Sequence, residues 1–198
     1  ETIGGWGAGA ANGIYGTLNI TGGIVEATGA CAVAMGSATV TISGDAQVKA
    51  GSDTIWINKD RKNTLNITDG TVSATNSTAI LVNYTVENGQ NNAQSVVIDG
   101  GLVEAASNTI ILYRESDLTI NGGKIAANGA TVIAAYGNST SAPNVTVNGG
   151  TIIQNGSGTD NLLIQRLNDT TVVLNGGLFI NNNPYNKTMF NEGIVYNA

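Results

Sequence analysis

The sequence predicts an all-β protein in which residues 1–198 form a single domain, a parallel β-helix or solenoid of about eight coils with three short strands each. Three observations predict this fold. A phrase of alternating apolar and polar residues, closed by a polar residue and glycine, returns along the chain, and no segment has helical periodicity. The returns are spaced by between 22 (Leu18 to Val40) and 31 residues (Leu65 to Val96), which is typical of a repeat architecture. Aligned on its first apolar residue, the phrase begins at Leu18, Val40, Leu65, Val96, Leu118, Val145 and Val172.

Each repeat contains the same three predicted strands in the same order. The first strand is the opening phrase, with inward apolar residues two places apart, such as Leu118 and Ile120. The second strand is shorter and carries one apolar position per repeat, followed two places later mostly by alanine; these positions are Val25, Val48, Val72, Val103, Ile125, Ile152 and Phe179. The third strand follows a Gly, Asn or Ser turn, in the segments TIWIN (54–58), TAILV (78–82), TIILY (109–113), TVIAAY (131–136) and NLLIQ (161–165). Because the strands are short, we expect each to pair with its counterpart one coil away. Segments 84–95, 136–144 and 181–187 are longer and are expected to protrude as loops.

A polar column is expected at the corner after the first strand. It contains Thr21, Ser43, Thr68, Asp99, Asn121, Asn148 and Asn175, each followed by glycine except at Asp69. Asparagine and glycine accept left-handed backbone angles at little cost, and stacked asparagine side chains can bond from coil to coil. We therefore expect Asn121, Asn148 and Asn175 to form a structural ladder.

With this ladder, the chain resembles the pectate-lyase-like right-handed parallel β-helices. The repeat style of LTINGGKIAANGAT (118–131) is also similar to the glycine- and threonine-rich β-helices of secreted bacterial surface proteins, adhesins and carbohydrate-binding proteins. The resemblance covers nearly the whole chain. It implies a right-handed solenoid in an extracellular location, and it makes polysaccharide a substrate or ligand class to consider.

Composition excludes several classes of partner and site. The net charge is -6 with only eight Lys and Arg, so we expect no nucleic-acid binding. No apolar run reaches membrane-spanning length, so we expect no membrane insertion. With no histidine and with Cys31 as the one cysteine, metal sites built on Cys and His are excluded, and we expect no metal and no cofactor. Cys31 lies among apolar neighbours and is expected to be a small buried side chain.

Catalytic machinery is not apparent in the sequence. A lyase of the resembled family needs an Arg or Lys base beside clustered carboxylates that hold calcium, and a hydrolase needs converging carboxylates. The fourteen Asp and Glu residues are scattered along the chain instead. We therefore expect a protein that is not an enzyme, with a polysaccharide lyase as the third choice of function.

A candidate ligand-binding ridge follows the third strand. Counting from the strand start gives one equivalent position for Lys59, Asn83, Arg114, Tyr136 and Arg166, with Tyr113 and Glu115 nearby. An aromatic face flanked by guanidinium groups suits a sugar that bears carboxylates. The alternative is a solvated edge on which Arg114 stacks on Tyr136 and pairs with acids.

The outward side of the third strand is predicted to be apolar. The same counting places Ile55, Ile110, Val132 and Leu162, and then Ile57, Leu112, Ala134 and Ile164, on the inner side. The outward positions would be Val33, Trp56, Ile80, Ile111, Ile133 and Leu163. A stripe of this size is normally covered. Either the loops 84–95 and 136–144 fold over it, or another chain does, which makes it a candidate assembly face.

The two ends of the chain have nearly the same phase in the repeat. Ile194 lies 22 residues after Val172 and begins another first strand that ends at Asn197, while Thr2–Gly5 starts near the same corner. The first residue is Glu1, which is compatible with a processed export signal or with a piece of a longer chain.

The sequence therefore predicts a non-catalytic, extracellular β-helix of a microbial surface. It would serve as a structural or adhesive rod that associates with itself or with neighbouring β-helix repeats, through its ends or through the third-strand face. A module that binds acidic polysaccharide is the leading alternative. An ice-binding face ranks last because the outward first-strand column is not a regular threonine array.

Overall fold

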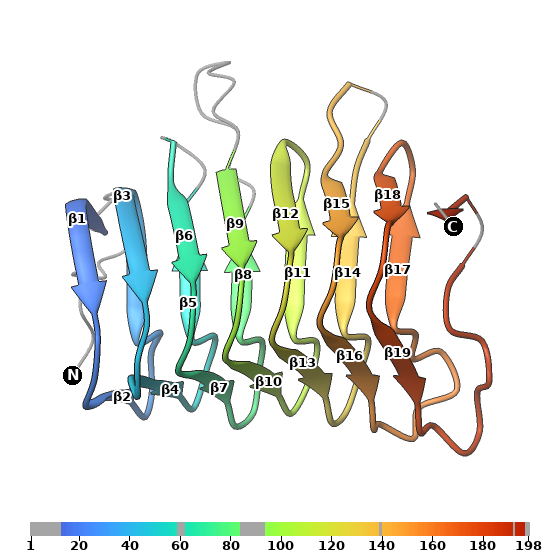
Figure 1. Ribbon diagram of the computed structural model, residues 1–198, viewed down its shortest axis with the longest axis horizontal. Coiled ribbons are helices and arrows are strands. Elements are labelled where there is room, and N and C mark those ends of the chain that lie inside the picture. The colour runs from blue at the N-terminus through green and yellow to red at the C-terminus, as the bar shows by residue number, and fades with distance from the viewer. Residues whose placement is uncertain (1–12, 59–61, 84–93, 139, 192, 197–198) are drawn as a thin grey trace.

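The computed structural model of the protein describes residues 13–58, 62–83, 94–138, 140–191 and 193–196. All regular elements in these ranges are β-strands. Neighbouring coils pair in parallel, and the coils follow one another from the N-terminal end at the left of Figure 1 to the C-terminal end at the right. The predicted all-β parallel solenoid is confirmed. No described segment forms an apolar helix long enough to cross a bilayer.

The strands fall into three columns that run along the solenoid axis. The first-strand column is at the front of Figure 1 and contains β1 (Ile14–Ile20), the second part of β3 (Val33–Ile42), β6 (Thr64–Ile67), β9 (Gln94–Ile98), β12 (Ser116–Ile120), β15 (Asn144–Val147), β18 (Thr171–Leu174) and β20 (Val195–Tyr196). The second-strand column is at the bottom and contains β2 (Ile24–Ala27), β4 (Gln47–Ala50), β7 (Thr71–Ala74), β10 (Leu102–Ala105), β13 (Lys124–Ala127), β16 (Thr151–Gln154) and β19 (Leu178–Asn181). The third-strand column is behind and contains the first part of β3, β5 (Ile55–Ile57), β8 (Ile80–Val82), β11 (Ile110–Tyr113), β14 (Ile133–Tyr136) and β17 (Ile164–Leu167).

The register of the first two columns agrees with the sequence alignment. Leu18 pairs with Val40 and Val40 with Leu65, and the series continues to Val172. The second strands pair in the same way from Val25 to Phe179. Because β3 runs without a break from the third-strand column into the first, those two columns form one sheet of 13 strands beside a second sheet of seven.

The number of coils is smaller than the expected eight. First strands recur often enough for eight, but the described residues complete only about six three-strand turns. The coil that begins with β18 continues through β19 and then has only an isolated bridge between Ile164 and Phe190 where a third strand would lie. The last first strand, β20, is two residues long. The expected count was wrong because it counted first strands, which outnumber complete turns.

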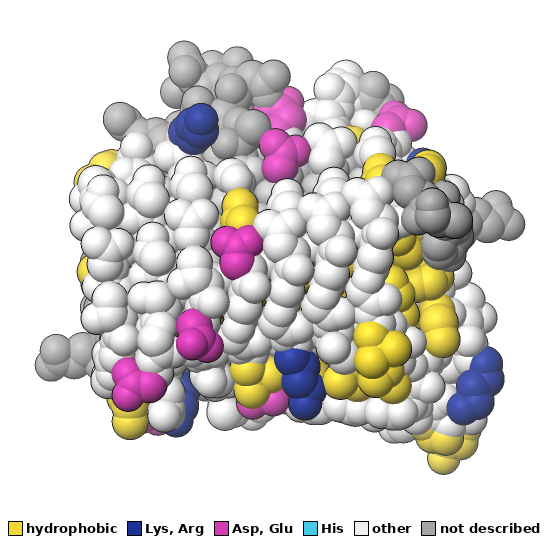
Figure 2. All heavy atoms as spheres, in the orientation of Figure 1, with side chains coloured by type: hydrophobic (Ala, Val, Ile, Leu, Met, Phe, Trp, Pro, Cys, Tyr) yellow, Lys and Arg dark blue, Asp and Glu magenta, His cyan; other side chains and the backbone are white. Residues whose placement is uncertain are grey.

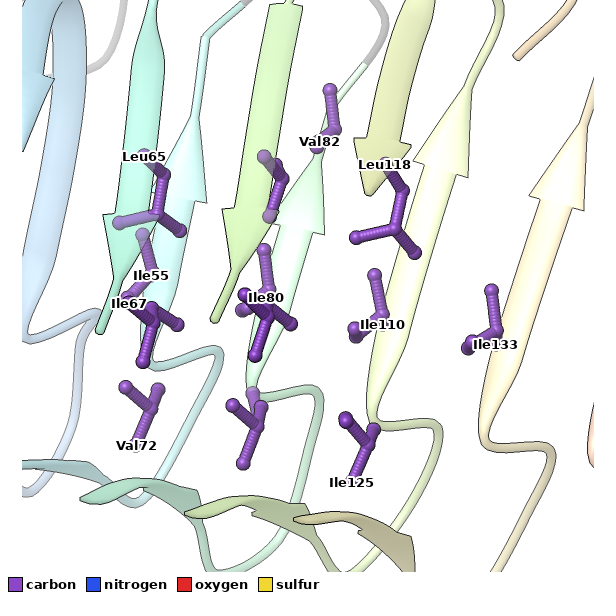
Figure 3. Packing of buried hydrophobic residues seen from close by; sticks show 14 of the residues in the cluster. Ile55, Leu65, Ile67, Val72, Ile80, Val82, Ile110, Leu118, Ile125 and Ile133 are labelled. Atoms are coloured by element: carbon purple, nitrogen blue, oxygen red, sulfur yellow. The ribbon is translucent and has the colours of Figure 1, made fainter. Parts of the chain in front are cut away.

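The core lies between the three columns and consists of stacked aliphatic side chains. In a middle coil, Leu65, Ile67 and Val72 are fully buried, together with Ile80 and Val82 on β8. Figure 3 shows these side chains pointing into the space between the columns, with equivalent residues of the next coil beside them. Each such side chain contributes roughly 1.5–3 kcal/mol by leaving water, so stability accumulates coil by coil.

The glycine pair at the corner has two separate functions, which the coil of Asn121 illustrates. A Cβ on Gly122 would lie 2.3 Å from the carbonyl oxygen of Asp99 in the preceding coil, so only glycine fits there. Gly123 has a φ of 80°, a left-handed conformation that favours glycine. Asn121 itself does not have a positive φ. Of the two residue types that accept left-handed angles at little cost, glycine therefore supplies the angle at this corner, at the second position of the pair.

The asparagine ladder is confirmed. Asn121 Nδ2 donates to Asp99 Oδ1 (2.7 Å), Asn148 Nδ2 to Asn121 Oδ1 (2.8 Å), and Asn175 Nδ2 to Asn148 Oδ1 (2.7 Å). A second ladder follows the second strand and was not anticipated. Asn155 Nδ2 donates to Asn128 Oδ1 (3.1 Å) and Asn182 Nδ2 to Asn155 Oδ1 (2.9 Å). Both ladders belong to the C-terminal half of the solenoid.

Candidate association surface

The structure brings together only part of the predicted ridge. Tyr113 pairs with Tyr136 on neighbouring third strands, and their rings stack with centroids 5.0 Å apart and planes inclined by 21°. Arg114 follows directly, with a φ of 50°, and its backbone N–H donates to the carbonyl of Tyr136 (2.9 Å). Glu115 is half-buried in the turn between β11 and β12. These residues share one edge of the solenoid.

Arg166 does not belong to this edge. It pairs with Ala135, and Ala135 pairs with Leu112, so Arg166 occupies an inward column. Its Nε donates to the carbonyl of Thr170 (2.6 Å), and its backbone N–H donates to Asn191 Oδ1 (2.7 Å). The prediction of one ridge made of Arg114, Tyr136 and Arg166 is wrong. The turn before β17 holds more residues than the turns of earlier coils, so counting from the strand start displaced Arg166. The expected equivalent Lys59 lies outside the described residues.

The tyrosine pair exposes less aromatic ring surface to a sugar than the sequence suggested. Because the rings stack on each other, one face of each is covered by its neighbour. Burial raises the pKa of Tyr136 above its ordinary value, and the adjacent Tyr113 raises it further. The Tyr136 hydroxyl therefore stays protonated and neutral at physiological pH.

The predicted assembly face is largely buried. Val33, Ile80, Ile133 and Leu163 are fully buried members of the hydrophobic core, so their outward assignment is wrong. Figure 3 shows Ile80 and Ile133 pointing inward. Trp56 and Ile111 do alternate outward, and they are half-buried.

The cause of this error is the length of the turn before the third strand. Ile55 and Ile110 follow their threonines directly, whereas Ala79 and Val132 stand between a threonine and the first inward isoleucine. A shift of one residue exchanges the two faces of a strand. Ala134, expected to face inward, pairs with the outward Ile111 and is nevertheless buried.

The loops expected to cover this face lie elsewhere or outside the described range. Residues 84–93 are outside it. The segment between β14 and β15 extends past the strand ends in Figure 1. In this segment Asn138 Oδ1 accepts the N–H groups of Thr140 (3.0 Å) and Ser141 (2.9 Å), and Asn138 and Ser141 form a bridge.

Side chains that could bind a metal ion are scattered in the part of the chain that the structure describes. No group of three or more Asp, Glu, Cys or His side chains there is placed to hold a metal ion. Cys31 is buried as expected, and burial raises the pKa of its thiol.

Large apolar side chains are exposed mainly in the terminal coils. In the first coil they are Tyr15 and Ile24; in the last coils they are Leu167, Leu178, Tyr185, Met189 and Val195. Between Ile24 and Leu167, no large apolar side chain among the described residues is classed as exposed. Figure 2 shows the same distribution from one side: the centre of the front face is mostly polar, and hydrophobic side chains gather toward the C-terminal end.

The last two coils also differ on their inner side, where polar residues take some of the apolar positions. Gln154 and Asn181 continue the inward alanine column of the second strands, and Arg166 continues the inward column of the third. Asn181 Nδ2 donates to the carbonyls of Asn186 (3.0 Å) and Thr188 (3.2 Å). At these inward positions near the C-terminal end, hydrogen bonds to the backbone replace apolar packing.

A buried asparagine organises the segment that closes the last coil. Asn183 is fully buried; its Nδ2 donates to the carbonyl of Gly158 (2.7 Å), and its Oδ1 accepts the N–H groups of Tyr185 (2.9 Å) and Asn186 (3.2 Å). Lys187 Nζ donates to the carbonyl of Asn183 (2.8 Å). Sequence reasoning treated 181–187 as a protruding loop and missed this arrangement, although the run Asn181–Asn183 was a visible signal for local side-chain bonds to the backbone.

The strand edges at the C-terminal end are not equivalent. The N–H of Leu163, just before β17, donates to the carbonyl of Met189 (2.8 Å), and Phe190 bridges to Ile164 and meets Phe179 edge-on at 5.4 Å. The edge of the third-strand column is thus occupied by residues 189–190. In contrast, β19 is the outermost strand of the second sheet at this end, as β2 is at the N-terminal end. The first-strand segment predicted after Ile194 is confirmed, since Val195 pairs with Val173. Asn197 and Thr2–Gly5 lie outside the described residues.

No family model, curated protein or solved structure matches the chain.

Proposed function

We propose that this protein is a non-catalytic structural unit of a microbial surface, an extracellular rod that associates with copies of itself through its terminal coils. Among the residues that the structure describes, exposed large apolar side chains are confined to those coils, and this observation supports the proposal. Exposed apolar surface is removed from water when a partner covers it, which favours association. Each such side chain stabilises a contact by roughly 1.5–3 kcal/mol at full burial.

The third-strand face supports association less well than the ends. Its outward residues Trp56 and Ile111 are already half-buried within one copy, so a partner would remove little more of their surface from water. Leu178 is 57 % exposed and Val195 is 51 % exposed. The ends therefore have more apolar area to gain by contact.

Size measurements on matched variants test the proposal. Light scattering across a concentration series should show wild-type mass above that of one chain, and Leu178→Lys should reduce it. The control is Leu102→Lys, because Leu102 lies in the same outward column of a middle coil, separated from Leu178 only by Lys124 and Thr151. We expect this control to associate like the wild type. A wild type that stays monomeric at the highest concentration would contradict the proposal.

One observation favours a second candidate function, the binding of acidic polysaccharide. Arg114 and the stacked pair of Tyr113 and Tyr136 lie on one outer edge, where a cation and aromatic ring edges are available together. Retention on polygalacturonate should then fall for Arg114→Ala and Tyr136→Ala, and it should be unchanged for Trp56→Ala on the same column of strands. Equal retention of all four proteins would exclude this edge as the binding site.

A further inference from the structure

We infer that Asn128 is a modification site, at which the side-chain amide is lost spontaneously as ammonia and a carboxylate takes its place. This inference is independent of self-association. Deamidation is favoured where glycine follows asparagine, because glycine has no Cβ to obstruct its own backbone nitrogen. Among the described residues, such pairs begin at Asn121, Asn128, Asn148, Asn155 and Asn175. Asn12 and Asn88 are also followed by glycine but lie outside the described residues.

The reaction uses two nitrogen atoms of the pair. The backbone nitrogen of Gly129 loses its proton and attacks Cγ of Asn128 to form a cyclic imide, while Nδ2 takes up a proton and leaves as ammonia. Water then opens the ring, and cleavage at Cγ gives aspartate, whereas cleavage at the main-chain carbonyl gives isoaspartate. The net change is hydrolysis of an amide. A hydrogen bond donated by either nitrogen must break first, so such bonds slow the reaction.

Both nitrogens are held at the three pairs of the first-corner ladder. At Asn148, Nδ2 donates to Asn121 Oδ1 (2.8 Å), and the N–H of Gly149 donates to the carbonyl of Ile120 (3.3 Å). The pairs that begin at Asn121 and Asn175 have the equivalent two bonds. These three pairs are therefore protected by the ladder and by the backbone of the preceding coil.

The two pairs of the second corner differ from each other. Asn155 Nδ2 donates to Asn128 Oδ1 (3.1 Å), and the N–H of the buried Gly156 donates to Gln154 Oε1. Asn128 begins this ladder and takes part in it only as an acceptor, and neither its Nδ2 nor the N–H of Gly129 donates a hydrogen bond to a described residue. Asn128 and Gly129 are both exposed. Because local opening costs least where few bonds break, this pair reacts most readily of the five.

The fold retains the reactive pair and accommodates its product. A Cβ at position 129 would collide with the carbonyl oxygen of Ala106, so a bulkier residue cannot replace Gly129 to slow the reaction. After conversion to aspartate, position 128 still accepts from Asn155 Nδ2. The first-corner ladder already begins in this way, on Asp99 followed by glycine. Deamidation therefore adds a negative charge at this corner without removing a ladder bond.

Peptide mapping after incubation at mildly alkaline pH tests the inference. Trypsin releases residues 125–166 as one peptide, which contains Asn128, Asn148 and Asn155 and has no internal Lys or Arg. In the folded protein, fragmentation should show that Asn128 gains the mass of deamidation roughly tenfold faster than the other two, because their hydrogen bonds must break first. In urea the three should convert at similar rates, since glycine follows each.

The opposite results would overturn the inference. Conversion of Asn148 or Asn155 as fast as that of Asn128 in the folded protein would contradict it, and so would a folded protein in which Asn128 is as slow as they are. The same order of conversion in urea would show that local sequence, and not the fold, selects Asn128.

Matched variants test the accommodation of the product. Asn128→Asp should melt with the wild type. Asn148→Asp should melt at a lower temperature, because Asn121 Oδ1 loses its donor. Equal losses in the two variants would show that an acidic side chain at position 128 disrupts the second ladder.

Discussion

The middle and last coils of this solenoid have the same repeat but are held together differently. In the coil of β6, β7 and β8, the inward residues are aliphatic and fully buried, with a neighbouring coil on each side. In the last two coils, three inward positions hold Gln154, Arg166 and Asn181, and the closing segment is organised by Asn183. The difference shows that near the C-terminal end hydrogen bonds from inward polar side chains to the backbone replace part of the aliphatic packing.

The largest expected effect is in the middle coil. Ile80→Ala removes a fully buried side chain and should lower the free energy of unfolding by about 2–5 kcal/mol. Its matched control is Leu81→Ala, the outward and half-buried neighbour on the same strand, which should cost clearly less. Chemical denaturation of both variants is the measurement. Equal losses would contradict the assignment of inner and outer faces on β8.

The next effect is in the last coil. Asn183→Ala leaves two backbone N–H groups and one carbonyl without their side-chain partner, which should cost about 1–3 kcal/mol. Because the closing segment lies at the end, we expect the loss to be local. Amide hydrogen exchange should accelerate in residues 185–191 and stay slow in β6–β11. If exchange accelerated uniformly along the solenoid, the last coil would be part of a single cooperative unit and the contrast between the coils would fail.

A smaller effect is expected at the exposed ladder. Asn148→Ala removes one bond donated to Asn121 and one accepted from Asn175, each with a net contribution of about 0.5–1.5 kcal/mol before the loss is reduced by solvent. Ser43→Ala, in the same corner column of the N-terminal half, should cost less. Thermal melting of the two variants compares the halves directly, and a larger loss for Ser43→Ala would show that the ladder contributes little.

The smallest effect concerns the tyrosine pair on the outer edge of the middle coils. Because the pKa of Tyr136 is raised, the folded state favours its neutral form. The corresponding stability is fully present below the ordinary tyrosine pKa and is lost as pH rises through the raised value. Absorbance titration should show one tyrosine that ionises late, and Tyr113→Phe should bring it partly back. An unchanged titration in Tyr113→Phe would leave burial as the one cause.

Much of this fold was predictable because the corner phrase gives an unambiguous alignment. Glycine at a crowded or left-handed corner cannot move by a residue, so the first- and second-strand columns from Leu18 to Val172 and from Val25 to Phe179 agreed with the structure. The third strand follows a turn of variable length and is apolar on both faces, so periodicity alone could not fix its register. Ile80, Ile133 and Arg166 were misplaced for this reason. Asn183 was missed because its bonds join a segment with no counterpart in the other coils.

The asparagine ladder has a direction, and this limits how such a chain can be lengthened by duplication. Every amide donates toward the preceding coil, and the series begins at Asp99, whose carboxylate only accepts. In a second copy of the coil that carries Asn121 or Asn148, the asparagine would donate a hydrogen bond to the preceding coil and accept one from the following coil. Such a copy would therefore fit at any point on the C-terminal side of Asp99. A second copy of the Asp99 coil placed among the asparagine coils would leave the side-chain Oδ1 of the asparagine in the preceding coil without a donor. At this corner, a duplicated coil therefore keeps the ladder intact when it is inserted on the C-terminal side of Asp99. A duplicated Asp99 coil inserted there breaks the ladder.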